Sequence, residues 1–425
     1  MSRKSVLILC DVFPPAFGPR MGYLCKYLRL NGWNPVVVTE YVDENTFAFL
    51  AKDVDVSYLR YYKRTGFAGK IEWGMTFLCD VMFGYKDRRL YREALKLSEK
   101  HPFDLILCST YRTFPLPAAG RLARKTGLPL VVDLRDIIEQ YTEDEFIKHK
   151  LPEIFGLRQI IASAFRKRNL AIRNKILSGA TCVTTVSPWH VSLLREYNKN
   201  TYLIYNGFDP DIFYPLSITV DKFYITYTGR LISVAMRNPE LLFQAVERLA
   251  GEKVITPDLF RLRWFVDDKS RRIIETEVLK YPGVAAFMDY PGYVSADEIP
   301  RILNESAILL LLTNKADAGG PKGVMTTKFF ESIAVGKPVL CVRGDEGCLE
   351  DVIRRTRSGL SAHNADEVYD FIKKHYLCRL EGKPCEDNSD KDEIKKFSRE
   401  EQARRFIEIF EQAMRLIRFP YQNHA

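Results

Sequence analysis

The stretch GGPKGVMTTKFFESIAVGK at 319–337 combines residue types that together bind phosphate groups. A Gly-rich loop containing Gly323 leads into a helix that we expect to begin near Thr327. The unpaired N–H groups of a first helical turn attract anions, and Lys328 adds positive charge beside them. Glu331 follows on the same helical face, where its carboxylate can accept hydrogen bonds from a ribose diol. The pattern predicts a nucleotide site; the alternative is a surface ion pair between Lys328 and Glu331.

A second set of phosphate-binding candidates closes the apolar run at 223–229. Gly229 and Arg230 end this run, and Arg237 comes shortly after. Arginine binds phosphate through two parallel N–H donors, which suits the diphosphate of a leaving group. Solvated arginines are the alternative, but a position directly after a buried strand favours the phosphate role.

Two carboxylates stand at the end of the apolar run at 129–134. Asp133 and Asp136, in the sequence DLRD, can accept hydrogen bonds from the hydroxyls of a sugar acceptor or form an ion pair with Arg135. An Asp-x-x-Asp pair also suits Mg²⁺, but two carboxylates alone do not make a metal site, and we expect none. A structural ion pair at the domain edge is the alternative.

The loop FPPAFGPR at 13–20 separates the first apolar run from the first helical segment. Gly18 lets the backbone approach a ligand closely, and the start of the following helix offers free N–H groups to an anion. We therefore add Gly18 to the candidate donor-binding residues. An ordinary tight turn explains the same sequence equally well.

Several classes of protein lack support in this sequence. It contains no GxGxxG, HExxH, GxSxG or Walker motif, which argues against a nicotinamide-dependent dehydrogenase and a zinc protease. Its six histidines are scattered, and no basic–aromatic cluster suggests nucleic-acid binding. We expect no cofactor and no nucleic-acid partner.

Short apolar runs alternate with segments of helical period, which is typical of a parallel α/β sheet. A Pro- and Asp-rich linker at 207–220 separates two such series. The first has strands expected at 5–12, 35–40, 104–109, 129–134, 181–187 and 201–206, and the second at 223–229, 261–267, 306–313 and 337–342. A last helix with one apolar face is expected at 397–418. The sequence thus predicts two α/β halves of similar size.

Composition indicates a cytoplasmic globular protein. Hydrophobic residues make up 46% of the 425 residues, and no run is long enough to span a membrane. The first apolar run, 6–10, is too short for a signal peptide, and the nine cysteines show no paired spacing. The net charge of +9 and the basic segment 158–175 suit an anionic lipid surface, to which the apolar segment 71–85 can contribute. Ordinary packed helices are the alternative for both segments.

Taken in order, several segments resemble the GT-B glycosyltransferases of family 4. They include FPPAFGPRMGYLCKYLRLNGWNPVVVT, VVDLRD, TTVS, IYNGFD, YTGRL, YPGYVSADEIPRIL and TKFFESIAVGKPVL, and they span nearly the whole chain. The resemblance implies an α/β fold with two Rossmann-like domains facing a central cleft. It implies an acceptor-side domain at 1–208, a donor-side domain at 209–396, and a C-terminal helix at 397–425 that crosses back to the first domain. It further implies retaining, metal-independent transfer from a nucleoside-diphosphate sugar, with UDP or GDP foremost.

By position, the resemblance assigns Glu331 to the ribose, Arg230 and Arg237 to the diphosphate, and Lys328 to a lysine present in part of the family. Gly323 stands where the Glu-x7-Glu motif of the family has its first Glu. The acceptor implied is a sugar or a lipid-linked sugar, in surface polysaccharide or glycolipid assembly, with the enzyme at the inner face of the cytoplasmic membrane. Because the first Glu is absent, a catalytically inactive scaffold or donor-binding protein is one alternative, and a nucleotide-sugar epimerase is another.

Overall fold

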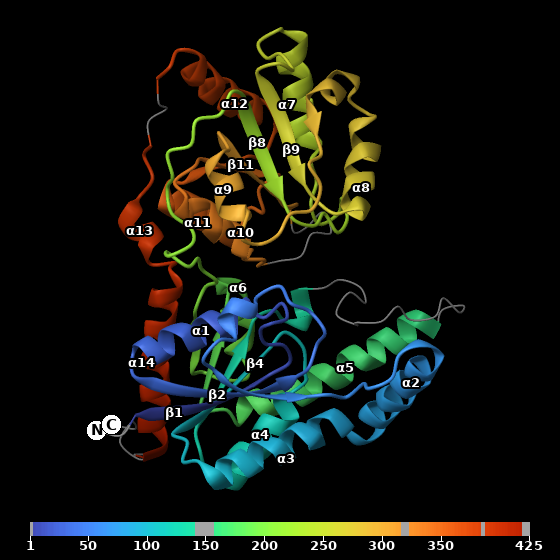
Figure 1. Ribbon diagram of the computed structural model, residues 1–425, viewed down its shortest axis with the longest axis vertical. Helices are drawn as coiled ribbons and strands as arrows, with labels where there is room; N and C mark the ends of the chain where they lie inside the picture. Colours follow the sequence, from blue (N-terminus) through green and yellow to red (C-terminus); the bar gives the residue numbers. More distant parts are fainter. Residues whose placement is uncertain (1–2, 141–156, 316–322, 384–386, 419–425) are drawn as a thin grey trace. The chain divides into compact units, whose positions relative to one another are not determined.

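The computed structural model describes residues 3–140, 157–315, 323–383 and 387–418. The chain forms two compact units, one of Met1–Tyr205 with Gln402–Ala425 and one of Asn206–Glu401. We call them the N-terminal unit and the C-terminal unit. Each is built on its own parallel sheet with helices on both faces (Figure 1).

The sheet of the N-terminal unit is made of apolar runs buried on both faces, as parallel sheets require. Its strands are β1 (Lys4–Cys10), β2 (Trp33–Glu40), β3 (Asp55–Leu59), β4 (Leu105–Thr110), β5 (Leu130–Leu134), β6 (Cys182–Thr185) and β7 (Thr201–Leu203). All pair in parallel, in the order β3-β2-β1-β4-β5-β6-β7. The strand order reverses between β1 and β4, so the loops after these two strands diverge and leave room for a ligand.

Helices cover both faces of this sheet. They are α1 (Pro19–Leu30), α2 (Gly66–Phe83), α3 (Tyr85–Lys100), α4 (Leu116–Thr126), α5 (Leu157–Ser178), α6 (Pro188–Leu194) and α14 (Arg399–Arg418), with short 3-10 turns η1 (Ala48–Leu50) and η2 (Ile138–Gln140). From Gln402 on, α14 belongs to the N-terminal unit. Its Phe406 and Phe410 are fully buried, and the Phe410 ring packs edge-on against Trp33 of β2. This apolar face fixes α14 on the sheet beside α1.

The C-terminal unit repeats the architecture. Its strands are β8 (Phe223–Thr228), β9 (Phe260–Phe265), β10 (Met288–Asp289), β11 (Ile308–Leu312), β12 (Val339–Val342) and β13 (Gly359–Ser361), in the parallel order β10-β9-β8-β11-β12-β13. Its helices are α7 (Glu240–Gly251), α8 (Asp268–Val278), α9 (Ile299–Asn304), α10 (Thr327–Ala334), α11 (Cys348–Thr356), α12 (Ala365–Leu380) and α13 (Lys391–Lys395), with the 3-10 turn η3 (Pro282–Phe287). The strand order reverses between β8 and β11.

The predicted α/β class is confirmed, and each strand expected from the sequence is present. The sequence did not predict β3, β10 and β13, and each of these lies at the edge of a sheet or is only two or three residues long. An edge strand buries less surface, so its sequence carries a weaker apolar pattern, as DVSYL in β3 illustrates. None of the described helices is both long and apolar enough to cross a lipid bilayer.

Candidate functional site

A small pocket lies where β8 and β11 end in the C-terminal unit. In open parallel sheets, ligands bind outside the carboxyl ends of the strands, at the point where the strand order reverses. The pocket has a volume of about 50 Å³. It is lined by Tyr227, Met236, Arg237, Leu311, Leu312, Thr313, Asn314, Val324, Thr326, Lys328 and Asp345. Two of the predicted phosphate-binding cations, Arg237 and Lys328, therefore share one pocket.

Lys328 is held in this pocket by Tyr227 on β8 and by Gly229 directly after that strand. Its ammonium nitrogen lies 4.9 Å from the centroid of the Tyr227 ring, which attracts the positive charge. Gly229 has a positive φ of 100°, and a Cβ atom there would lie 2.1 Å from the Lys328 ammonium. The glycine is therefore required both by the backbone conformation and by the space that the lysine occupies.

The electrostatics of the pocket suit an anion. Burial and the nearby charge of Arg237 lower the pKa of Lys328 to about 7, against the opposite effect of Glu331. Arg237 donates to the Tyr227 hydroxyl over 3.3 Å, and that hydroxyl donates to the Arg230 carbonyl over 2.9 Å. Two crowded cations with a depressed lysine pKa indicate a site that an added negative charge would stabilise.

The start of α10 contributes backbone donors to the same pocket. Thr326 is the N-cap residue, and its side chain makes no capping hydrogen bond. Thr326 also lines the pocket. Thr327 is the first helical residue, and Gly323 precedes it with a positive φ of 65°. The free N–H groups of this turn lie beside Lys328.

Glu331 lies one turn after Lys328 on α10 and is half-buried. Burial raises the pKa of Glu331, while the charges of Arg399 and Lys328 act in the opposite direction. Arg399 is almost fully buried at the start of α14 and donates its backbone N–H to the carbonyl of Phe208. No sequence pattern predicted Arg399, because it lies 68 positions along the chain from Glu331 and follows no motif.

The structure separates Arg230 from Arg237. The Arg230 side chain is three-quarters exposed, and its Nε lies 3.3 Å from a carboxylate oxygen of Asp267. Asp267 caps α8 by accepting the N–H of Ser270. Arg230 does not line the pocket that holds Arg237 and Lys328. Of the two predicted arginines, only Arg237 is brought to Lys328 within this unit.

Asp133 is the centre of a buried network in the N-terminal unit. Arg20 donates to both carboxylate oxygens over 3.0 and 2.9 Å, and the hydroxyls of Ser109 and Thr184 donate over 2.9 and 2.8 Å. Although burial acts to raise its pKa, the charge and hydrogen bonds of Arg20 with those of Thr184 and Ser109 lower the pKa of Asp133. Its partner is thus Arg20 and not Arg135, which corrects the ion pair considered from the sequence.

Arg135 instead pairs with Asp11, at the carboxyl ends of β1 and β5. Its guanidinium lies 5.4 Å from the ring centroid of Tyr111, which follows β4. Asp136 accepts a hydrogen bond from the Gln140 amide over 3.0 Å, and burial raises the pKa of Asp136. Asp136 is half-buried, so it keeps a face toward solvent. The N-terminal unit thereby gathers polar side chains where its strand order reverses.

Gly18 packs closely against the backbone of its own loop. A Cβ atom at this position would lie 2.9 Å from the Phe13 Cα and from the Val12 carbonyl oxygen. Its φ of −133° is open to any residue, so close backbone packing is what requires glycine here. Gly18 is the N-cap of α1 and is followed by Pro19, the first residue of that helix.

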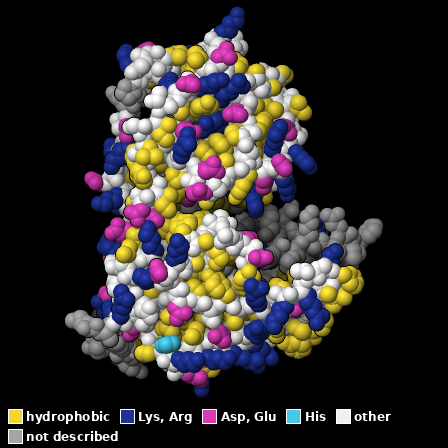
Figure 2. Space-filling model, in the orientation of Figure 1, with side chains coloured by type: hydrophobic (Ala, Val, Ile, Leu, Met, Phe, Trp, Pro, Cys, Tyr) yellow, Lys and Arg dark blue, Asp and Glu magenta, His cyan; other side chains and the backbone are white. Residues whose placement is uncertain are grey.

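The two segments considered for lipid contact are both helical. The apolar segment 71–85 lies mostly in α2, in which Thr76 is the buried residue. Phe67, Met75 and Met82 of α2 are each more than half exposed. Figure 2 shows hydrophobic side chains gathered over α2, with Lys and Arg beside them. An ordinary packed helix would bury one apolar face, so α2 differs from that alternative.

Comparison with known proteins agrees with this architecture. Residues 17–206 match the family described as glycosyl transferase 4-like domain. HepE of Anabaena, solved in complex with UDP, has a TM-score of 0.63 at 14% identity, covering 96% of this chain and 100% of that chain. Sucrose-phosphate synthase from Thermosynechococcus elongatus has a TM-score of 0.62 at 16% identity, covering 96% and 99%.

The UDP-GlcNAc 2-epimerase from Methanocaldococcus jannaschii shares the fold more distantly, with a TM-score of 0.54 at 10% identity, covering 96% and 99%. No curated protein sequence matches the chain significantly. Identities this low show a common fold, and the resemblance found in the sequence is confirmed. The chain thus has the GT-B fold, and its residues 17–206 are similar to the glycosyl transferase 4-like domain.

Proposed function

We propose that the protein is a glycosyltransferase that takes a sugar from a nucleoside-diphosphate sugar, with UDP as the first nucleotide to test and GDP as the second. The observation that carries this proposal is the placement of Lys328 against Gly229 and Tyr227, beside Arg237, at the strand reversal of the C-terminal unit. Among proteins of this fold, HepE has been solved with UDP-glucose and S. aureus MnaA with UDP.

The chemistry follows from the charges. Negative charge builds up on the departing diphosphate as the bond to the sugar breaks. Fixed cations and helix N–H groups aimed at that diphosphate stabilise it without rearranging. We assign Lys328, Arg237 and the first turn of α10 to the diphosphate, and Glu331 to the ribose. The family resemblance favours retention at the anomeric carbon without a metal, with the leaving phosphate accepting the proton of the acceptor.

The acceptor side is proposed for the N-terminal unit, at the group formed by Asp136, Asp11 and Tyr111. Asp136 is the candidate to orient an acceptor hydroxyl, since Asp133 is fully occupied by Arg20, Ser109 and Thr184. We propose a sugar or lipid-linked acceptor and a role in surface polysaccharide or glycolipid assembly. The exposed apolar side of α2 supports peripheral contact with an anionic membrane, at its cytoplasmic face.

Titration of the purified protein with UDP, GDP and their sugar conjugates tests the donor site. A ligand at about 100-fold excess over Kd stabilises the fold by about 2.7 kcal/mol, which a thermal unfolding assay resolves readily. We expect a shift with one nucleoside diphosphate that is lost in Glu331→Ala. Asp351→Ala, which removes an exposed carboxylate of α11 that pairs with Arg354, is the matched control and should keep the shift.

The reaction itself is followed by analysing products from the sugar conjugate that binds. Transfer to an added sugar or lipid-linked acceptor supports the proposal. Release of an epimerised sugar would favour the epimerase alternative, and tight binding without turnover would favour a donor-binding scaffold. Absence of binding to every nucleoside diphosphate would contradict the donor-site assignment.

A further inference from the structure

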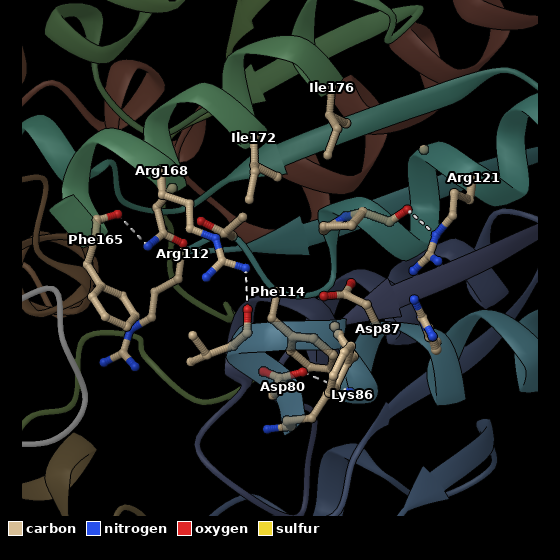
Figure 3. Close-up of a pocket in the computed structure, with 18 of the residues that line it drawn as sticks. Asp80, Lys86, Asp87, Arg112, Phe114, Arg121, Phe165, Arg168, Ile172 and Ile176 are labelled. Carbon is tan, nitrogen blue, oxygen red and sulfur yellow. Dashed lines mark hydrogen bonds between the residues drawn. The ribbon is translucent and has the colours of Figure 1, made fainter. Parts of the chain in front are cut away.

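A second cavity lies wholly within the N-terminal unit, and none of the donor-site or acceptor-site residues assigned above lines it. It is bounded by α2, α3, α4 and α5 and has a volume of about 930 Å³. Sites for small molecules typically occupy roughly 300–1,000 Å³, so this one is large enough for an extended ligand. Figure 3 shows Ile172 and Ile176 projecting from α5 toward the space above Phe114 and Asp87.

The charge of the cavity wall is strongly positive. Seven lining residues are Lys or Arg and two are Asp. Lys86 is paired with Glu40, but Arg88, Arg112, Arg124 and Arg168 form no ion pair with a carboxylate in the described parts of the chain. Several unpaired guanidinium groups around one space attract an anion, and phosphate matches their paired N–H donors best.

Contacts within the fold position the side chains of two of these arginines, Arg168 and Arg112. Arg168 of α5 donates to the carbonyl of Val81 in α2, which fixes its guanidinium at the cavity wall (Figure 3). The Nε of Arg112 is buried and has no hydrogen-bond partner among the described residues. The Arg112 guanidinium lies over the Tyr111 ring at 4.6 Å, so its position is set by packing. A buried donor without a partner is costly, and an incoming oxygen atom would satisfy it.

The rest of the wall is apolar. Trp73 and Phe77 stack on each other with centroids 5.5 Å apart and face the cavity from α2. Phe165, Ile172 and Ile176 face it from α5. The other side of α2 is exposed and apolar, as described above. A ligand that fills this space therefore has an apolar part as well as an anionic part.

The cavity adjoins the candidate acceptor site. Arg112 follows Tyr111 after β4, and Ile138 lies two residues after Asp136, following β5. Since β4 and β5 are parallel neighbours, these wall residues stand at the same edge of the sheet as the polar group proposed to orient the acceptor. A molecule held in the cavity would thus present its anionic end near that edge.

We infer that this cavity binds an amphiphilic phosphate, a molecule with a phosphate or diphosphate group at one end of an apolar chain. The arginines hold the phosphate oxygens and the walls from α2 and α5 enclose the start of the chain. As an assignment of the acceptor class, the inference rests on the proposed function; as a binding site, it stands on the cavity alone.

Isothermal titration of the full chain with farnesyl diphosphate, in the absence of any bilayer, tests the inference. Inorganic pyrophosphate and farnesol serve as probes of the anionic and the apolar part of this ligand. We expect farnesyl diphosphate to bind at least tenfold more tightly than either probe. Arg168→Gln and Arg124→Gln should each weaken it about tenfold. Their sequence neighbours Lys167→Gln and Lys125→Gln, exposed and outside the cavity wall, should leave it unchanged.

Each variant is first checked by thermal unfolding, and Ile172→Trp provides an independent test because it fills the cavity without altering charge. That variant should weaken farnesyl diphosphate and leave UDP binding intact. Equal affinity for farnesyl diphosphate and pyrophosphate, no binding of farnesyl diphosphate without a bilayer, or binding unaffected by all three cavity variants would overturn the inference. If the unsubstituted protein binds farnesyl diphosphate but does not bind UDP, that result would instead contradict the proposed function.

Discussion

The ammonium group of Lys328 occupies the space that a side chain on Gly229 would need, since a Cβ atom there would lie 2.1 Å from its nitrogen. Gly229 directly follows β8, and Lys328 lies in the first turn of α10, almost 100 positions later in the chain. The strand and the helix therefore determine together where the positive charge stands. This relationship allows the lysine to be displaced without mutating it.

Replacement Gly229→Ala should weaken UDP binding by pushing the lysine out of its place. Loss of one charge-assisted hydrogen bond of about 1.5–3 kcal/mol corresponds to a Kd about tenfold to a hundredfold higher. Titration calorimetry measures this change. Gly292→Ala is the matched control, because Gly292 also has a positive φ, of 94°, yet nothing lies within 4 Å of its Cβ position. Equal effects of the two variants would show that backbone strain alone is responsible.

The affinity for UDP should fall as the pH rises above 7. The pKa of Lys328 is lowered to about 7 by burial and by Arg237, with Glu331 acting oppositely, so the free protein loses this charge above that pH. A bound diphosphate favours the charged lysine, and binding must then take up a proton, which raises Kd by up to about tenfold per pH unit. The terminal phosphate of UDP is fully ionised above about pH 7, so it does not contribute to the slope.

The measurement is the Kd of UDP between about pH 7 and pH 9. In Lys328→Met the slope should vanish, whereas Lys280→Met, at an exposed lysine paired with Glu277, should keep it. A slope that persists in Lys328→Met would assign the titration to another group.

The fold was accessible from the sequence because buried parallel strands are near-continuous apolar runs. Val6–Cys10 is fully buried and has no polar residue, so its pattern is unmistakable. The edge strand β3 and the two-residue β10 lack that signal, since none of their residues is fully buried. Their existence depends on pairing with the preceding strands β2 and β9, and such pairing is not visible in the local sequence pattern.

The candidate site could be predicted only in part, because local spacing marks residues of one helix and does not mark contacts between distant segments. Lys328 and Glu331 share one helix, so their spacing is readable. The roles of Tyr227 and Arg399 come from tertiary packing alone, and no local pattern marks them. Arg230 resembles a phosphate ligand in sequence, yet Asp267 at the start of α8 lies beside it. Sequence spacing cannot foresee such a competing partner.

Asp133→Asn should act on stability more than on transfer. The Arg20–Asp133 pair is buried, with side-chain exposures of 4% and 0%. Removing one charge of a buried pair leaves the other uncompensated and costs about 3–5 kcal/mol. Urea unfolding measures the loss. Glu411→Gln breaks the exposed pair with Lys4 and should cost less than about 1 kcal/mol. If Asp133→Asn has normal stability but shows no transfer, Asp133 would have a role at the acceptor site after all.

The raised pKa of Asp87 should make the N-terminal unit less stable as the pH rises from about 4 to 7. Burial raises its pKa to about 7, with Asp80 adding to the shift and Ala118, Arg121 and Lys86 opposing it. Its unfolded pKa is about 3.9, so between these values the native state binds one more proton than the unfolded state. The contribution of the neutral carboxyl to the free energy of unfolding is fully present below about pH 4. It is lost as the pH rises to about 7, by about 4 kcal/mol in all.

Asp87→Asn keeps an oxygen that can accept the Ala118 N–H and cannot ionise. The free energy of unfolding of this variant, relative to the unsubstituted protein, should therefore rise by about 4 kcal/mol between about pH 4 and pH 8. Urea unfolding across this range measures the difference. Asp53→Asn, at a largely exposed aspartate in the same unit, should show little change. Parallel pH profiles for Asp87→Asn and the unsubstituted protein would mean that Asp87 ionises in the native state as readily as in the unfolded chain.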